Sequence, residues 1–206
     1  MSIKKGESWG RLVELPRGVP VATGDAGAAR ILSVADGAAV VLTGGDLART
    51  VGRGAGATPQ PGDQVRAFDV DLLRARLDDG PSQPVLAHLL MRSPWIRGGP
   101  WRGPAVAAMN AEFFGRYNVA PRGHPNDGRV EIVELSADMP WRARWNAWRR
   151  LPTGSHLPHP QIDTRSVRSL TLNFERDVTV ILDGERTDRA RHIEVVVDRD
   201  AGLIYI

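Results

Sequence analysis

Two glycine-containing segments each place a carboxylate at the start of a helix-like stretch. Residues 23–27 read Thr-Gly-Asp-Ala-Gly, and residues 43–46 read Thr-Gly-Gly-Asp. Backbone N–H groups and the positive end of the helix dipole make such a helix start suitable for binding phosphate. Many strand-to-helix turns need glycine for steric reasons alone, and neither GxxxxGK[ST] nor GxGxxG occurs in the chain. The two segments are therefore candidates for phosphate binding, with plain turns as the alternative.

Two further carboxylate-bearing segments adjoin predicted strands. Asp183-Gly184-Glu185 follows the alternating residues 178–182 and predicts a hairpin turn. A carboxylate at the rigid end of a strand could also act as the general base that deprotonates a hydroxyl group. Asn126-Asp127-Gly128 is likewise typical of a turn, although the loop around Asp127 could hold a hard cation through carboxylate and carbonyl oxygens. The spacing leaves both alternatives open at both places.

Residues 141–150 combine tryptophan and arginine at helical spacing. Trp141, Trp145 and Trp148 recur at i, i+4 and i+7, which places three indoles on one helical face. Such a helix could plug one end of a sheet core. The alternative is that it anchors the protein at the surface of an anionic membrane, where indoles and arginines are both favoured. The arginines of this segment are Arg142, Arg144, Arg149 and Arg150.

The elements that must position these residues change character along the chain. Between residues 16 and 54, two apolar runs each lead through a glycine turn into an alanine- or leucine-rich stretch. This succession predicts two strand–helix units of an α/β region. The predicted strands are 19–22 and 39–42, and the predicted helical stretches are 28–32 and 47–51.

Downstream of a Gly- and Pro-rich linker at 52–63, the pattern becomes short alternating runs separated by Asp-Gly and proline. Many short strands with one helical insert predict a β-sandwich or barrel, so the fold class is α+β, a small α/β lobe followed by a β-sandwich. The predicted strands are 65–70, 72–77, 85–91, 105–109, 130–135, 167–174, 178–182, 193–197 and 203–206.

The composition excludes several classes of protein. With 206 residues, 42% hydrophobic and 25% charged, the chain is long enough for one large domain or two small ones and is not disordered. The absence of cysteine excludes disulfides, thiolate zinc sites and iron–sulfur clusters. No signal sequence and no bilayer-spanning run is evident, so we expect a cytoplasmic protein, attached at most to the inner face of the membrane. The sequence predicts no broad basic surface and hence no nucleic-acid partner.

Several segments, taken in order, resemble the bacterial diacylglycerol kinase family of lipid kinases, relatives of sphingosine kinases and, more distantly, of NAD kinases. Each motif is short, but their order over about a hundred residues is fairly specific. The matching segments are Asn110–Gly115 with Ala120-Pro121, Asn126–Val133, the GSHLPHP stretch at 154–160, Leu182–Glu185 and, upstream, the LTGGDLARTVG stretch at 42–52.

The resemblance implies a nucleotide-binding α/β lobe at 1–63 and a β-sandwich lobe at 64–206, with ATP and a lipid meeting between them. It implies that Glu185 is the base that removes the proton of the lipid hydroxyl, with Asp183 as its neighbour. It also implies Mg²⁺, in a structural site made by Asp127 and by the backbone oxygens of His124 and Arg129. The implied nucleotide-loop residues are Gly24, Asp25, Gly27, Thr43, Gly44, Gly45 and Asp46.

The chain departs from this family at its nucleotide loop. Where the family has GGDGT, residues 23–27 have Thr23 in place of the first glycine, Ala26 at the next small position and Gly27 in place of threonine. Gly45 stands where the family has asparagine, and only about twenty residues precede the loop, where the family has a strand, a helix and a second strand. Two hypotheses follow: an active kinase for a lipid hydroxyl, or a non-catalytic relative that binds lipid, nucleotide or a protein partner.

Overall fold

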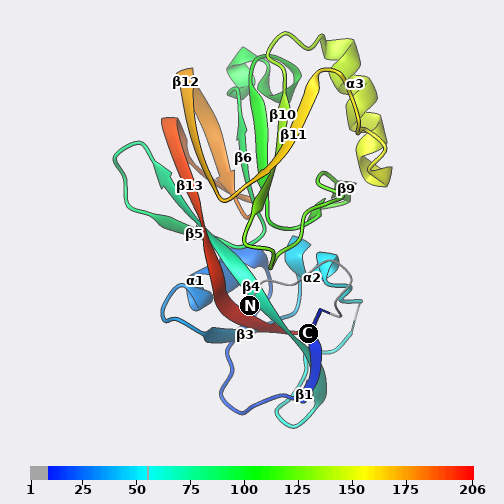
Figure 1. Ribbon diagram of the computed structural model, residues 1–206, viewed down its shortest axis with the longest axis vertical. Helices are drawn as coiled ribbons and strands as arrows, with labels where there is room; N and C mark the ends of the chain where they lie inside the picture. Colours follow the sequence, from blue (N-terminus) through cyan, green and yellow to red (C-terminus); the bar gives the residue numbers. More distant parts are fainter. Residues whose placement is uncertain (1–8, 55) are drawn as a thin grey trace.

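A computed structural model describes residues 9–54 and 56–206. Residues 1–8, which the sequence predicts not to be a signal, and position 55 of the predicted linker lie outside the described residues. The fold is mixed, with one large, mainly antiparallel sheet of eleven strands, a two-stranded sheet and few helices (Figure 1).

The helices and strands are short at the N-terminal end of the chain and long at the C-terminal end. The strands are β1 (Arg11–Glu14), β2 (Val21–Ala22), β3 (Ala38–Leu42), β4 (Gln64–Leu77), β5 (Gln83–Val85), β6 (His88–Arg92), β7 (Ala105–Met109), β8 (Phe113–Phe114), β9 (Tyr117–Asn118), β10 (Val130–Leu135), β11 (Ile162–Val167), β12 (Ser169–Leu182) and β13 (Glu185–Tyr205). The helices are α1 (Asp25–Leu32), α2 (Asp46–Thr50) and α3 (Trp141–Arg150), with 3₁₀ turns η1 (Trp95–Arg97), η2 (Gly99–Trp101) and η3 (Leu151–Thr153).

The small end of the molecule contains the two strand–helix units. Strand β2 pairs in parallel with β3, and β3 pairs in parallel with the last residues of β13. Val40 and Leu42 of β3 face a core with α1 and α2, whereas Val41 faces a second core on the other side of the sheet. Because β3 is buried on both faces, its sequence is a continuous apolar run rather than an alternating one.

Strands β4 and β13 pair with each other and extend into both ends of the molecule, which they join (Figure 1). The predicted strands 65–70 and 72–77 are one strand, β4. Opposite its middle, the register of β13 shifts between Asp198 and Gly202. The carboxylate of Asp71 holds this irregularity, since it accepts hydrogen bonds from the N–H groups of Gly128 (2.6 Å) and Asp200 (2.9 Å). Because both ends share these strands, the division between residues 63 and 64 stays a prediction.

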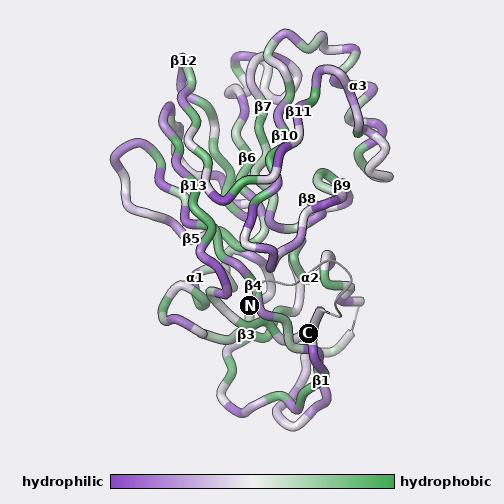
Figure 2. Tube along the Cα trace, in the orientation of Figure 1, coloured by the Kyte–Doolittle hydropathy of each residue, from purple (hydrophilic) through white to green (hydrophobic). Residues whose placement is uncertain are grey.

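The large end contains the remaining strands, in the order β12-β6-β7-β10-β11, with α3 beside them (Figure 1). Its core is formed by the buried faces of β4, β5, β6, β7, β10, β12 and β13. Figure 2 shows the hydrophobic residues mostly along the strands and the hydrophilic residues mostly in the turns and at the strand ends. The predicted strands 105–109 and 130–135 and the predicted helix 141–150 have these bounds in the structure. Strands β1, β8, β9 and β11 were not predicted. The predicted strand 178–182 and most of 167–174 lie in one strand, β12, and the predicted strand 193–197 and most of 203–206 lie in β13.

Candidate functional site

A group of ionisable side chains lies where the small end meets the large end. Asp25 begins α1, Asp46 begins α2 and His88 begins β6. One possible ligand atom from each of the three lies within 4.8 Å of the others. We call these three residues the junction cluster; it is the one such metal-capable group among residues 9–54 and 56–206.

Asp25 connects the two glycine turns of the sequence. Its carboxylate is buried and accepts hydrogen bonds from the N–H groups of Asp46 (2.6 Å) and Leu47 (3.2 Å), so it caps α2 from a different element. A Cβ at Gly45, where φ is +103°, would lie 2.4 Å from the carboxylate of Asp25. A Cβ at Gly44 would lie 2.7 Å from the carbonyl oxygen of Thr23. Sterics therefore account for Gly44 and Gly45, including the departure from asparagine.

The first glycine turn has no such steric requirement. Gly24 has an extended backbone and open space where a Cβ would stand, and a Cβ at Gly27 would make only an ordinary 3.7 Å contact with Ala22. The start of α1, a helix of 8 residues, has no side-chain cap, and the space at the Cβ position of Gly24 is open. Thr43, in the second turn, donates its hydroxyl hydrogen to the carbonyl of Ala22 (3.1 Å) and holds the two turns together.

His88 completes the junction cluster and was missed in the sequence. Its Nε2 lies 2.8 Å from Oδ2 of Asp46, whose Oδ1 accepts the N–H of Gly115 (2.7 Å). Burial disfavours the charged ring, but the hydrogen bond to Asp46 and the charge of Asp183 outweigh burial and raise the pKa of His88. The available signal was a histidine inside the apolar run 85–91, since a polar side chain on a buried strand needs a partner.

The junction cluster is crowded with negative charge. Burial is the main cause that raises the pKa of Asp25 to about 6, and the nearby carboxylates of Asp183 and Asp46 add to it. A divalent cation would relieve this repulsion, because carboxylate oxygens of Asp25 and Asp46 keep lone pairs beyond their backbone hydrogen bonds. The donor set therefore fits Mg²⁺, with His88 orienting Asp46 rather than binding the ion.

Asp183 lies in the turn between β12 and β13, and Glu185 is the first residue of β13. Asp183 has φ +46° and accepts hydrogen bonds from three consecutive N–H groups, those of residues 86–88, at 2.7–3.0 Å. Burial raises the pKa of Asp183. Glu185 is exposed and pairs with Arg30 of α1, at 3.1 Å between Oε2 and Nη1. This pair spans the two ends of the molecule, and the hydrogen bond from Arg30 lowers the pKa of Glu185.

The predicted loop around Asp127 lies away from the junction cluster in the hydrogen-bond network. Oδ1 of Asp127 accepts the N–H of Arg129 (2.9 Å), which is the local turn that its sequence predicts. Burial raises the pKa of Asp127. Nδ1 of His124 accepts the N–H of Asn126, and its ring packs on Trp9, with 4.6 Å between centroids.

An apolar pocket of about 430 Å³ opens inside the large end. Its lining includes the side chains of Leu90, Trp101, Tyr117, Trp148 and Ile181. Phe114 also lines it, and the ring of Phe114 packs edge-on against His88, with 4.9 Å between centroids. The apolar pocket and the junction cluster therefore meet at the contact between Phe114 and His88.

Helix α3 divides its aromatic residues between this pocket and solvent. Trp148 lines the pocket, whereas Trp141 and Trp145 are 62% and 43% exposed. The position of Trp148 agrees with a helix that plugs one end of a core, and membrane anchoring through the exposed indoles stays a prediction.

The expectation that Arg144 belongs to the basic surface of α3 is wrong. Arg144 is 2% exposed, and its guanidinium donates to backbone carbonyls, among them those of Met139, Pro100, Gly103 and Ser136. Burial lowers its pKa. The position of Arg144, three residues after Trp141 and four before Trp148, places it on the inner side of the helix.

The sequence matches no protein-family profile and no curated protein. The structure is similar to that of a protein described as a diacylglycerol kinase from Bacillus anthracis strain Sterne, with a TM-score of 0.60, 14% identity and coverage of 89% of this chain and 76% of that one. A diacylglycerol kinase structure from the same strain gives a TM-score of 0.59, 13% identity and coverage of 89% and 74%. The chain has a diacylglycerol kinase-like fold. Among the described residues, no helix is both long and apolar enough to cross a bilayer.

Proposed function

We propose that this diacylglycerol kinase-like protein transfers a phosphoryl group from ATP to the hydroxyl group of a lipid. The observation that carries the proposal is the contact between Phe114 and His88, which joins an apolar pocket to a cluster suited to a divalent cation. A lipid chain in the pocket would have its polar end at the junction cluster. In this proposal the small end is the nucleotide lobe and the strands of the large end form the β-sandwich lipid lobe.

In this proposal each residue at the junction has a separate role in phosphoryl transfer. Mg²⁺ held by Asp25 and Asp46 would neutralise charge on the phosphates of ATP. The start of α1, uncovered at Gly24, offers backbone N–H groups to a phosphate. His88 fixes the carboxylate of Asp46 through the 2.8 Å hydrogen bond. Asp183 fixes the turn that carries Glu185 by binding the N–H groups of residues 86–88.

Glu185 is the proposed base. Its lowered pKa keeps the carboxylate ionised at neutral pH, and its exposed pair with Arg30 contributes little stability, so the side chain can exchange partners at small cost. On releasing Arg30, Glu185 would accept the proton of the lipid hydroxyl while Arg30 becomes available to the phosphates.

A second magnesium site is proposed in the loop of Asp127. Its ligands would be the carboxylate of Asp127 and the backbone oxygens of His124 and Arg129. Asp127 is half-buried, and a bound cation would offset the cost of burying its charged form. Anomalous scattering from Mn²⁺ in crystals of the protein tests it, and density at the junction cluster alone would contradict it.

The alternative function is that of a non-catalytic module that binds lipid, nucleotide or a protein partner. Both oxygens of Asp25 are already engaged by the backbone of α2, and the nucleotide loop has Thr23 and Ala26 where the family has glycine. Loss of catalysis with the pocket kept intact would account for both observations.

The deciding experiment is ATP-dependent phosphorylation of diacylglycerol and sphingoid bases with Mg²⁺ present. We expect turnover by the wild type and a loss of about 100-fold or more in Glu185→Gln, since a positioned base contributes about 10²–10⁴-fold. Glu194→Gln is the matched control, because Glu194 is also a glutamate paired with an arginine, Arg76. Turnover unchanged in Glu185→Gln contradicts its assignment as base. Absence of turnover in the wild type favours the binding module.

We also propose that the large end attaches to an anionic membrane surface. Trp95, Ile96 and Trp141 are exposed by 62%, 89% and 62%, and no acidic residue occurs within α3. The basic side chains of α3 that remain at the surface complement a negatively charged bilayer. Sedimentation with vesicles should be stronger for anionic than for neutral lipid and should weaken with salt. Equal binding to both vesicle types would contradict this attachment.

A further inference from the structure

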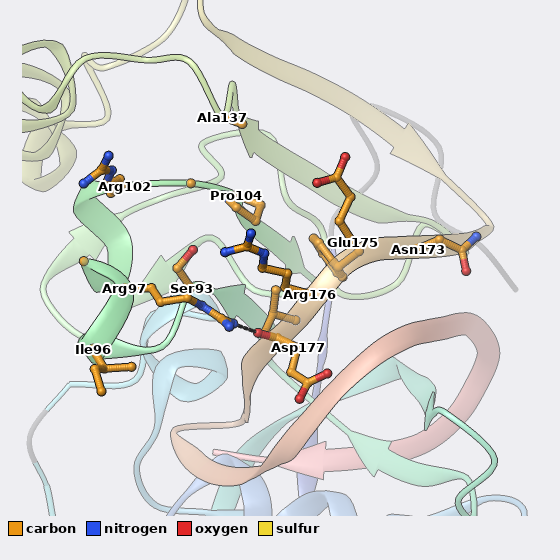
Figure 3. Close-up of a pocket in the computed structure, with 14 residues that line it drawn as sticks. Ser93, Ile96, Arg97, Arg102, Pro104, Ala137, Asn173, Glu175, Arg176 and Asp177 are labelled. Atoms are coloured by element: carbon orange, nitrogen blue, oxygen red, sulfur yellow. Dashed lines mark hydrogen bonds between the residues drawn. The ribbon is translucent and has the colours of Figure 1, made fainter.

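A second large cavity, of about 700 Å³, lies at the large end outside the apolar pocket. It is formed between the loop of residues 93–104 and residues 173–178 of β12 (Figure 3). Different residues of the same loop line the two cavities: Trp95 and Trp101 line the apolar pocket, whereas Ile96 and Arg97 line this one. Its volume is within the range of about 300–1,000 Å³ that is usual for ligand sites.

The local backbone produces this cavity. The pairing of β12 with β13 shifts in register between Asn173 and Val178, so residues 174–177 leave the regular ladder and face the loop. On the loop side, a Cβ at Gly103 would lie 2.6 Å from Oγ of Ser93, and Gly103 has φ +75°. Glycine at this position therefore allows the loop to fold closely on itself and to form a defined wall.

The cavity gathers arginines from both walls. Arg97 from the loop and Arg176 from β12 both extend into the space, and Arg102 lies on its rim (Figure 3). Arg97 is positioned by a hydrogen bond to the carbonyl oxygen of Asp177. None of the described ion pairs places a carboxylate on Arg97, Arg102 or Arg176.

The two acidic residues of the lining neutralise this charge only in part. The carboxylate of Asp177 pairs with Arg191 and is close enough to Arg97 for their charges to attract, without an ion pair between them. The carboxylate of Glu175 points away from Arg97 and Arg176 in Figure 3. Two guanidinium groups that line one cavity repel, and a dianion between them would replace this repulsion with charge-assisted hydrogen bonds.

We propose that this cavity binds a phosphate monoester, with Arg97 and Arg176 holding the phosphate and Ser93 Oγ and Arg102 available to its remaining oxygens. The excess of positive charge suits a dianion better than a carboxylate, and the cavity is large enough to take the organic group that carries the phosphate as well. A soluble phosphate ester and the headgroup of a phosphorylated lipid share this chemistry. The site is separate from the junction cluster, so it is independent of the proposed kinase activity.

The test is calorimetric titration without ATP, using glycerol 3-phosphate, glycerol, and vesicles of phosphatidylcholine with or without phosphatidic acid. We expect binding of at least one phosphate-bearing probe, no binding of glycerol, and affinity at least about tenfold weaker in Arg97→Gln/Arg176→Gln, as expected when two charge-assisted hydrogen bonds are lost. Arg176→Gln alone should also weaken binding, and it alters an exposed side chain that the fold does not need. Arg17→Gln/Arg168→Gln, which removes the same charge elsewhere on the surface, should bind like the wild type.

The results distinguish a soluble phosphate ester from a lipid headgroup, and they show whether the cavity binds phosphate at all. Binding of glycerol 3-phosphate that depends on Arg176 supports a soluble ester, and binding only of phosphatidic acid vesicles that depends on Arg176 supports a lipid headgroup. Equal loss in the cavity variants and in Arg17→Gln/Arg168→Gln indicates attraction by net charge alone and overturns the site. Binding of every probe unchanged in the cavity variants, or absent in the wild type, overturns it as well. Since ATP is left out, none of these results depends on phosphoryl transfer.

Discussion

The junction and the outer surface of the large end differ in the burial and the partners of their polar and aromatic side chains. At the junction, Asp25 and His88 are buried, and each has a hydrogen-bond partner from another element. At the outer surface, Arg176 and the indole of Trp141 are exposed, and Arg176 has no carboxylate partner among the described ion pairs. Buried charge requires either structural partners or a ligand, whereas exposed arginine and tryptophan cost little until a partner covers them.

Arg144 breaks this division, because it lies at the large end yet is buried like a junction residue. Replacing it in Arg144→Met keeps much of the apolar stem but leaves several buried carbonyls without donors. We expect the free energy of unfolding to fall by about 3 kcal/mol, measured by urea denaturation. Arg149→Met, on the exposed side of α3, should change it by less than about 0.5 kcal/mol. A similar decrease in the free energy of unfolding in both variants would show that the buried hydrogen bonds of Arg144 do not contribute to stability.

The next largest effect concerns the buried carboxylate of Asp25. Its pKa is about 6 in the folded protein against 3.8 for the ordinary group, so its contribution to stability is full below pH 3.8 and is lost as the pH rises through 6. This loss amounts to at most about 3 kcal/mol. The free energy of unfolding of the wild type relative to Asp25→Asn should therefore be greater at pH 4.5 than at pH 7.5, as measured by urea denaturation.

The same two proteins also test whether the junction cluster binds a cation. If the junction cluster binds Mg²⁺, adding the ion at pH 7.5 should raise the stability of the wild type more than that of Asp25→Asn. A difference between the two proteins that stays constant from pH 4.5 to pH 7.5 would show that Asp25 is not the titrating group.

The smallest effect is expected at the exposed indole of Trp141. Because 62% of this residue is exposed, Trp141→Ala should change the free energy of unfolding by less than about 0.5 kcal/mol. Trp148→Ala is the contrast, since that indole lines the apolar pocket and packs on Trp101 and Tyr117. A large loss of stability in Trp141→Ala, measured by thermal denaturation, would mean that the outer face of α3 is part of the core.

Hydrophobic periodicity and glycine turns in the sequence predicted those elements whose bounds depend on neighbouring residues in the chain. The bounds of β7, β10 and α3 follow from hydrophobic periodicity, and the glycine turns located Asp25 and Asp46. His88 could not be assigned in this way, because its partner Asp46 lies 42 residues earlier in the chain. Strand β11 likewise depends on pairing with β10 across the α3 insert rather than on its own pattern. The inward position of Arg144 was available from helical spacing, but its charge favoured the surface.

The central claim is that the junction cluster binds a magnesium–nucleotide complex. Calorimetric titration of ATP into the protein with Mg²⁺ tests it most directly, using the wild type, Asp46→Asn and the exposed control Asp36→Asn. We expect binding by the wild type and by the control. The affinity of Asp46→Asn for the complex should be at least about tenfold lower, because the cation would lose one of its two carboxylate ligands. Chelation of Mg²⁺ should have a similar effect. Absence of ATP binding by the wild type, or equal binding by Asp46→Asn, would contradict the claim.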